Sequence, residues 1–214
     1  MSSHVAHHFD DASQQFDAAR LGMWIFLATE VLFFGGLFTG YAYYRTLYTP
    51  AFIEGSRHLD LVLGTINTAV LLLSSFTIVL AIRGAQTDNR RATIALLAAT
   101  IVLGTVFLAI KGYEYSVKFE EHHVPGASFS LGETHDEAVE PRHVEMFFAL
   151  YFGMTGLHAV HMIIGVGVVA VVCVLAWRGH YTSQYYTPLE ITGLYWHFVD
   201  VVWVFLFPLL YLIR

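Results

Sequence analysis

His197 and Asp200 stand three residues apart near the C-terminus, inside a run that is otherwise apolar and aromatic. On a helix, residues at this spacing share one face. Ionisable side chains are costly in hydrocarbon unless they face protein, water or a partner. The pair therefore has a role other than lipid-facing packing. A ligand site, a proton relay and a structural pair in which Asp200 fixes the tautomer of His197 are all compatible with the spacing.

Glu30 is a second ionisable residue within an apolar and aromatic run. It lies about nine residues into the first predicted helix, or roughly 14 Å deep at 1.5 Å per residue. No base is close in sequence, so its partner must be another helix, a lipid or water. Because the depth is similar to that of His197 and Asp200, we hypothesise a contact with that pair. An interhelical hydrogen bond and a proton-handling role both suit such a carboxyl group.

His158 and His161 lie on one face of another apolar segment. Two such histidines are candidate metal or haem ligands. Haem held by two histidines, however, uses opposite sides of the ring, which neighbours on one helix cannot supply. We therefore favour packing or hydrogen bonding for both residues.

Two further polar features lie inside apolar segments. Lys111 and Glu114 are spaced as an i, i+3 pair, and a self-contained ion pair is the favoured interpretation. Asn67 is predicted to form a hydrogen bond with a neighbouring helix.

The composition indicates the setting of these residues. Of the 214 residues, 56% are hydrophobic and 13% are charged, and the mean hydropathy is +0.57. Soluble domains carry about 25% charged residues, so this chain has about half the usual share and is predicted to be a polytopic membrane protein. The net charge of −6 argues against nucleic acid as a partner.

Five segments are long enough to cross a bilayer, which takes about 20 apolar residues. Each must be helical, because backbone groups in hydrocarbon need partners within the segment. The sequence therefore predicts an all-α protein, a polytopic bundle of five transmembrane helices over residues 21–214 that follows a polar, His- and Asp-rich tail at 1–20. The predicted helices are 21–48, 59–82, 92–119, 144–177 and 189–213.

The orientation is decided by the placement of basic residues. Arginine and lysine are equally numerous on the two predicted sides, so the count alone gives no direction. The short connection with Arg83, Arg90 and Arg91 is the densest basic patch, and we place it and the N-terminus in the cytoplasm. The acidic connection 120–143 then faces outward, where a solvated surface is favoured over a docking site for a basic partner.

Taken together, these segments resemble subunit III of the haem–copper oxidases, the family that includes cytochrome c oxidase and quinol oxidase. The form resembled is the bacterial type with five helices, which lacks the first two of the seven in larger members. The blocks that carry the resemblance, in order, are Arg20-Leu21-Gly22-Met23 with Glu30-Val31-Leu32-Phe33-Phe34, Asn67-Thr68-Ala69-Val70-Leu71-Leu72, Glu114-Tyr115, Gly156-Leu157-His158 with His161, and Tyr195-Trp196-His197-Phe198-Val199-Asp200-Val201-Val202-Trp203.

The resemblance implies a non-catalytic subunit in the bacterial cytoplasmic membrane. Such a chain holds no haem or copper itself, packs with subunits I and II, retains phospholipid, and supports proton uptake while partner chains reduce oxygen to water. Membership of a respiratory supercomplex is compatible with this role.

The resemblance also assigns residues. Glu30 matches a buried carboxylate beside a lipid cleft, and Arg178 and His180 match positions near lipid head groups, where a cation suits an anionic phosphate. Lys111 departs from the family pattern, in which an uncharged polar residue is expected. The structural signature comprises Asn67, Glu114, His158, His161, Trp196, His197 and Asp200.

Three alternative functions stay open at this stage. The first is an accessory subunit of nitric oxide reductase from the same family. The second is a haem-b membrane cytochrome that uses the histidines. The third is a proton-coupled transporter with Glu30 and Asp200 as a relay, although five helices give no evident inverted repeat.

Overall fold

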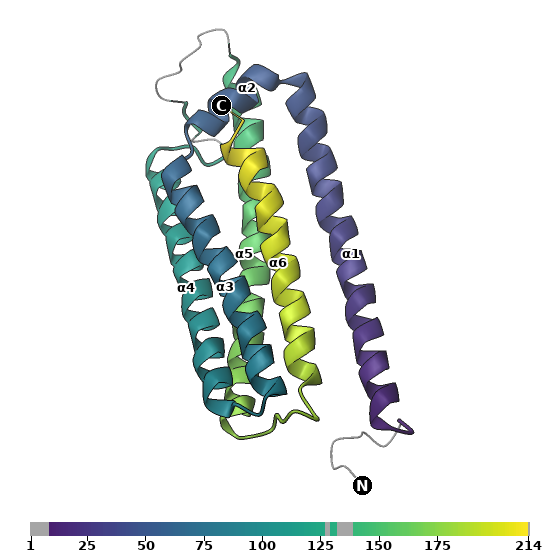
Figure 1. The fold of residues 1–214 in the computed structure, drawn as a ribbon. Coiled ribbons are helices and arrows are strands. Elements are labelled where there is room, and N and C mark those ends of the chain that lie inside the picture. Colours follow the sequence, from purple (N-terminus) through teal and green to yellow (C-terminus); the bar gives the residue numbers. More distant parts are fainter. Residues whose placement is uncertain (1–8, 127–128, 132–138, 214) are drawn as a thin grey trace.

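The computed structural model describes residues 9–126, 129–131 and 139–213, and within them the chain is helical without β-strands. Five helices are long and apolar enough to cross a membrane, which confirms the predicted fold class. A sixth, shorter helix was not predicted. The helices are α1 (Ala12–Leu47), α2 (Thr49–Arg57), α3 (Leu61–Gln86), α4 (Arg90–Glu120), α5 (Pro141–Trp177) and α6 (Thr187–Tyr211) (Figure 1).

The first helix begins well before the predicted start at residue 21. The Asp11 side chain caps α1 by accepting a hydrogen bond of 2.7 Å from the backbone N–H of Gln14. This cap satisfies one of the donors that a helix start leaves open, so the helix extends beyond its apolar part. The point where an apolar run begins therefore does not mark where the helix begins. The predicted tail is helical from residue 12, and its residues 1–8 lie outside the described part of the chain.

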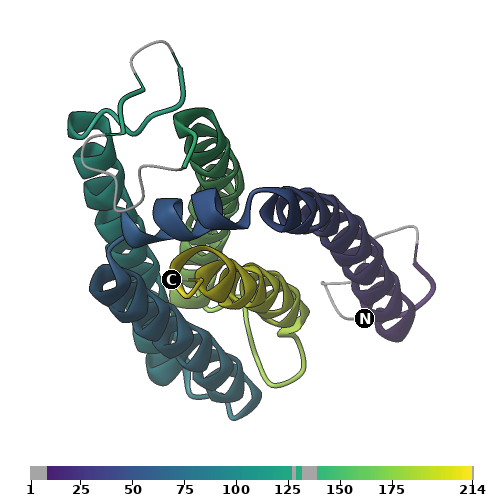
Figure 2. The same cartoon turned by 90° about the horizontal axis from the view of Figure 1, so that it is seen from above.

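The short helix α2 occupies a segment that we predicted to be a connection. Pro50 lies in its first turn, where a missing N–H costs nothing. The helix covers one end of the bundle, as Figure 2 shows. Gly55 permits this close packing, because a Cβ atom there would lie 2.3 Å from Cδ1 of Phe147 on α5.

The bundle has a compact part and an outlying helix. Helices α3, α4, α5 and α6 pack side by side, while α1 leans away from them and contacts mainly α6 (Figures 1 and 2). Large apolar side chains on α1, such as Trp24 and Leu32, are exposed. In a membrane these side chains face lipid or another subunit.

The two ends of the bundle carry different connections. The start of α1, the α3–α4 loop and the α5–α6 loop lie at one end, here called the N-terminal end (Figure 1). The end of α6, helix α2 and the α4–α5 connection lie at the other, here called the C-terminal end. Of the predicted acidic connection 120–143, residues 127–128 and 132–138 lie outside the described residues.

Candidate functional site

A polar cluster is buried in the compact part of the bundle, where α4, α5 and α6 meet. The ammonium of Lys111 donates hydrogen bonds to Glu114 Oε2 at 3.0 Å, to the Tyr151 hydroxyl at 3.0 Å and to the Tyr211 hydroxyl at 2.9 Å. The two tyrosines in turn donate to Glu114 Oε1, at 2.8 Å from Tyr151 and 2.5 Å from Tyr211. The predicted ion pair is present, but it is not self-contained, because it joins three helices.

The Lys111 charge is compensated on all sides. Its three N–H donors are used, and its Nζ lies 5.2 Å from the centroid of the Trp203 ring and 4.9 Å from that of Tyr151, where the ring faces attract a cation. Lys111 and Glu114 each expose only 3% of their surface. A buried charge is tolerable when it is paired and fully hydrogen-bonded, and this cluster meets both conditions.

A second acid–base pair joins α1 to the bundle. Glu30 Oε2 lies 3.2 Å from His161 Nε2 on α5. His161 Nδ1 lies 2.8 Å from the Leu157 carbonyl oxygen, which only accepts hydrogen bonds, so Nδ1 carries a proton. Nε2 is then either the acceptor for a neutral carboxyl group or the donor to a carboxylate. The carboxyl group of Glu30 and the imidazole of His161 are thus within hydrogen-bond distance of each other across two helices.

The partner of Glu30 differs from the one we hypothesised. His197 is turned toward α3, where its Nδ1 lies 2.6 Å from the Ser75 hydroxyl. Glu30 instead faces α5, so the expected contact with His197 and Asp200 was wrong. His197 and Asp200 thus face α3, whereas Glu30 on α1 faces α5.

Asp200 also does not fix the tautomer of His197. It is buried, and neither carboxylate oxygen makes a hydrogen bond of good geometry to the described residues. The polar neighbour of Asp200 is the Ser75 hydroxyl, which is already bonded to His197. Ser75, rather than a direct contact, therefore links the two residues of the motif.

The two histidines of α5 have separate environments. His158 is 1% exposed and packs between Phe107, at 5.5 Å between ring centroids, and Trp203, at 5.1 Å. His161 faces Glu30. Packing is confirmed for His158 and hydrogen bonding for His161. In the described part of the chain, no group of three or more His, Cys, Asp or Glu residues could hold a metal ion.

Hydroxyl groups on α3 bind the aromatic motif of α6. Trp196 donates its Nε1–H to Ser74 at 3.1 Å, and Trp203 donates to Thr68 at 3.0 Å. Together with Ser75, these hydroxyls form three cross-links between the two helices. Sequence reasoning missed them, although Thr68 and Ser75 are seven residues apart and so share one helix face. The predicted interhelical bond of Asn67 is confirmed, since its Nδ2 donates to the Phe107 carbonyl on α4 at 3.3 Å.

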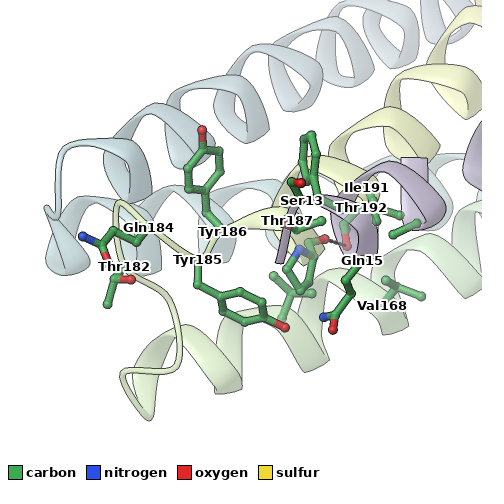
Figure 3. Close-up of a pocket in the computed structure, with 14 residues that line it drawn as sticks. Ser13, Gln15, Val168, Thr182, Gln184, Tyr185, Tyr186, Thr187, Ile191 and Thr192 are labelled. Carbon is green, nitrogen blue, oxygen red and sulfur yellow. Dashed lines mark hydrogen bonds between the residues drawn. The ribbon is translucent and has the colours of Figure 1, made fainter. Parts of the chain in front are cut away.

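Two pockets flank the contact between α1 and α6 at the N-terminal end. The larger, of about 820 Å³, lies on the α5 side and is here called the uncharged pocket (Figure 3). The smaller, of about 320 Å³, lies on the other side and is lined by Arg20, Glu190 and His197; it is here called the charged pocket. Phe16 and Ile191 line both and so separate them.

Arg178 and His180 are exposed just after α5, and neither lines these pockets. The residue that ties this region together is Arg90, which sequence reasoning did not single out. Its guanidinium donates to the carbonyls of Ala176, at 3.1 Å, and Trp177, and so satisfies acceptors at the end of α5.

A family model for cytochrome c oxidase subunit III matches residues 3–213. The chain belongs to the cytochrome c oxidase subunit III family. Relatives include cytochrome c oxidase subunit 3 of Thermostichus vulcanus, 33% identical over 95% of this chain and 92% of the relative. The probable quinol oxidase subunit 3 of Staphylococcus epidermidis is 32% identical over 99% of this chain and 96% of the relative.

A third relative bears on partners. It is a protein of Aeropyrum pernix named heme-copper oxidase subunit I+III. The alignment is 30% identical and covers 92% of this chain but 23% of the much longer relative. Membership of the subunit III family implies association with other oxidase subunits, and the name of this relative fits that implication. The chain is thus a multi-pass membrane subunit of the haem–copper oxidase family.

Proposed function

We propose that this chain is a non-catalytic subunit of a terminal oxidase in the bacterial respiratory chain. Oxygen is reduced to water in the partner subunits, which hold the haem and copper. This chain stabilises the catalytic subunit, retains phospholipid beside α1 and supports proton uptake. The observation that carries the proposal is the Glu30–His161 pair, a contact of 3.2 Å between an acid and a base at the junction between α1 and the compact part of the bundle.

The position of this pair supports a role in proton supply or durability. The side chains of Glu30 and His161 are 19% and 15% exposed, so the pair is open to lipid, water or a partner subunit at the edge of the bundle. The core pair Lys111–Glu114, in contrast, is 4% and 3% exposed and has its bonding capacity filled by protein. Of the two pairs, only the one on α1 has access to its environment.

The N-terminal end supports the proposed lipid role and orientation. It carries five exposed arginines: Arg20, Arg83, Arg90, Arg91 and Arg178. An anionic leaflet attracts such residues, so we place this end, and the N-terminus, at the cytoplasmic face. Arg178 and His180 then lie at the level of lipid head groups, at the same end of the bundle as the two pockets that flank α1.

The test uses the assembled complex. An affinity tag on this chain is expected to recover subunits I and II with their haem spectrum. Recovery of a nitric oxide reductase instead, or a haem band from this chain alone, would contradict the assignment.

The Glu30→Ala variant tests the functional part. We expect unchanged assembly but a shorter catalytic lifetime during turnover, or altered lipid content by native mass spectrometry. Thr29→Ala is the matched control, because Thr29 is exposed on the same helix and bonds only the Phe26 carbonyl of its own helix. If Glu30→Ala matched wild type in both lipid content and inactivation kinetics, the proposed role of Glu30 would be wrong.

A further inference from the structure

We propose that the uncharged pocket binds a lipid whose head group carries no charge and is rich in hydroxyls, of the glycosyl diacylglycerol type. This inference rests on the proposed retention of lipid beside α1 and names the class of lipid that this pocket selects. It is argued from the charge, the depth and the hydrogen-bonding groups of the pocket.

Charge is the first argument. None of the described residues that line this pocket is Lys, Arg, His, Asp or Glu. A phosphate entering it would lose hydration without meeting a counter-charge, which is costly. A carboxylate beside the pocket adds repulsion, because the Ser13 hydroxyl in the pocket lining donates to Asp11 at 2.9 Å. A hydrogen bond from the Gln14 backbone, followed by the one from Ser13, lowers the pKa of Asp11, so its carboxylate is ionised at neutral pH. An anionic head group is thus disfavoured.

The polar groups of the pocket suit a head group with many hydroxyls. Amides come from Gln15 and Gln184, and hydroxyls come from the α5–α6 loop and both flanking helices. Figure 3 shows these side chains arriving from three separate segments, with Ser13 and Gln15 on α1 and Thr182 and Gln184 on the loop. Amides and hydroxyls both donate and accept hydrogen bonds, so they match sugar hydroxyls, which do the same.

The depth of the pocket suits a lipid. Its polar lining lies at the level of the α5–α6 loop, whereas Val168 and Val172 lie on α5 below it. Val168 is about nine residues before the end of α5, roughly 14 Å deep at 1.5 Å per residue. The lining thus changes from polar to apolar along the membrane normal, as an amphipathic ligand requires. The volume of about 820 Å³ accommodates a head group and the upper part of its chains.

The charged pocket provides an internal comparison. It shares Phe16 and Ile191 with the uncharged pocket but adds Arg20 and Glu190. A cation and a carboxylate together complement a zwitterionic phospholipid. The two sides of one helix contact therefore differ in head-group preference, and a variant on one side serves as the control for the other.

The experiment exchanges lipid on the purified oxidase complex. The complex is incubated with equal amounts of a glycosyl diacylglycerol, phosphatidylglycerol and phosphatidylethanolamine, and retained lipid is identified by native mass spectrometry. We expect the glycolipid to be enriched roughly tenfold over phosphatidylglycerol, a factor that corresponds to about 1.4 kcal/mol.

Three variants locate the site. Val168→Trp fills the pocket from an exposed position and is expected to remove the glycolipid. Gln184→Lys places a cation in the lining and is expected to shift retention toward phosphatidylglycerol. Arg20→Gln, in the charged pocket, is the control and is expected to leave glycolipid retention unchanged while reducing phosphatidylethanolamine.

The outcomes separate the two proposals. If phosphatidylglycerol is the lipid lost on Val168→Trp, the head-group inference is overturned and lipid retention stands. If Val168→Trp changes no retained lipid while wild type still holds lipid, the pocket is the wrong site and the inference again falls. If wild type holds no lipid after exchange, the proposed retention falls as well.

Discussion

The two acid–base pairs of this protein differ in what surrounds them. Lys111 and Glu114 lie in the compact part of the bundle, where two tyrosine hydroxyls complete their hydrogen bonds. Glu30 and His161 lie where α1 meets the bundle, partly exposed and joined by one contact at 3.2 Å. The first pair holds three helices together. The second joins a helix that otherwise has few contacts with α5. The two pairs thus differ in burial and in the number of hydrogen bonds that complete them.

The largest expected effect comes from breaking the core pair. Lys111→Met leaves Glu114 buried without its counter-charge, and removal of one partner from a buried pair costs about 3–5 kcal/mol. We expect a loss of this size in the free energy of unfolding, measured by denaturant titration in detergent micelles.

The double variant Lys111→Met with Glu114→Gln is the control for this effect. Replacing both charges leaves no unpaired ion, so most of the lost stability should return. A single variant as stable as the double variant would show that the pair is not energetically coupled, and the comparison would fail.

Packing density gives the next test. A Cβ atom at Gly104 would lie 2.7 Å from Cη2 of Trp196, whereas at Gly36 on α1 nothing lies within 4 Å. Gly104→Leu is therefore expected to cost about 1–3 kcal/mol through overpacking. Gly36→Leu should cost little in the isolated chain. Thermal unfolding of both variants measures the difference, and equal losses would show that α1 is packed as tightly as the core.

The pair on α1 should contribute less to stability. His161→Gln removes a polar contact between two membrane helices, and such contacts contribute about 0.6 kcal/mol on average. We expect a loss of about this size in the free energy of unfolding, by the same denaturant titration used for Lys111→Met. A loss as large as that of the core variant would contradict the division between the two pairs.

The smallest expected effect is a pH dependence at the C-terminal end. His123 lies against the His58 ring at 4.9 Å and forms a contact of 3.1 Å with Glu121, which also pairs with Lys118. Burial, followed by the positive charges of His58 and Lys118, lowers the pKa of His123 below its ordinary value of 6.5. The folded state therefore binds this proton less readily than the unfolded state.

It follows that the contribution of His123 is complete above about pH 6.5 and declines as the pH falls below that value. We expect amide exchange at the end of α4, corrected for its intrinsic rate, to accelerate between pH 7.5 and pH 5.5. Amide exchange at the N-terminal end of the bundle, far from His123, is the internal control and should not show this acceleration. His123→Phe should remove the dependence, and an unchanged profile in that variant would assign it to other groups.

The sequence predicted the type of each long helix because hydrocarbon permits few alternatives. Apolar length and the need to satisfy backbone groups internally lead directly to five spans. The prediction from the sequence missed the helix Thr49–Arg57, because a nine-residue helix with Pro50 at its start has the composition of a connection. It also failed at the start of α1, where Asp11 extends the helix through polar residues.

The sequence identified the ionisable residues of the candidate site but not the residues that they contact. Glu30, His161, His197 and Asp200 were recognised because ionisable groups in an apolar helix are conspicuous. Their contacts depend on the rotation of each helix about its axis, which a spacing of three residues leaves undetermined. Tyr151, Tyr211 and Ser75 were not identified, because an uncharged hydroxyl in an apolar helix does not by itself indicate that a partner is required.

The sequence by itself determined that this chain spans a membrane as five helices and which residues are costly to bury there, since both follow from transfer energies along the chain. The tertiary structure alone decided that Glu30 meets His161, that Lys111 is enclosed by two tyrosines, and that the two sides of the α1–α6 contact differ in charge. Those outcomes depend on how helices distant in sequence are rotated and packed against one another, and no local pattern encodes that rotation.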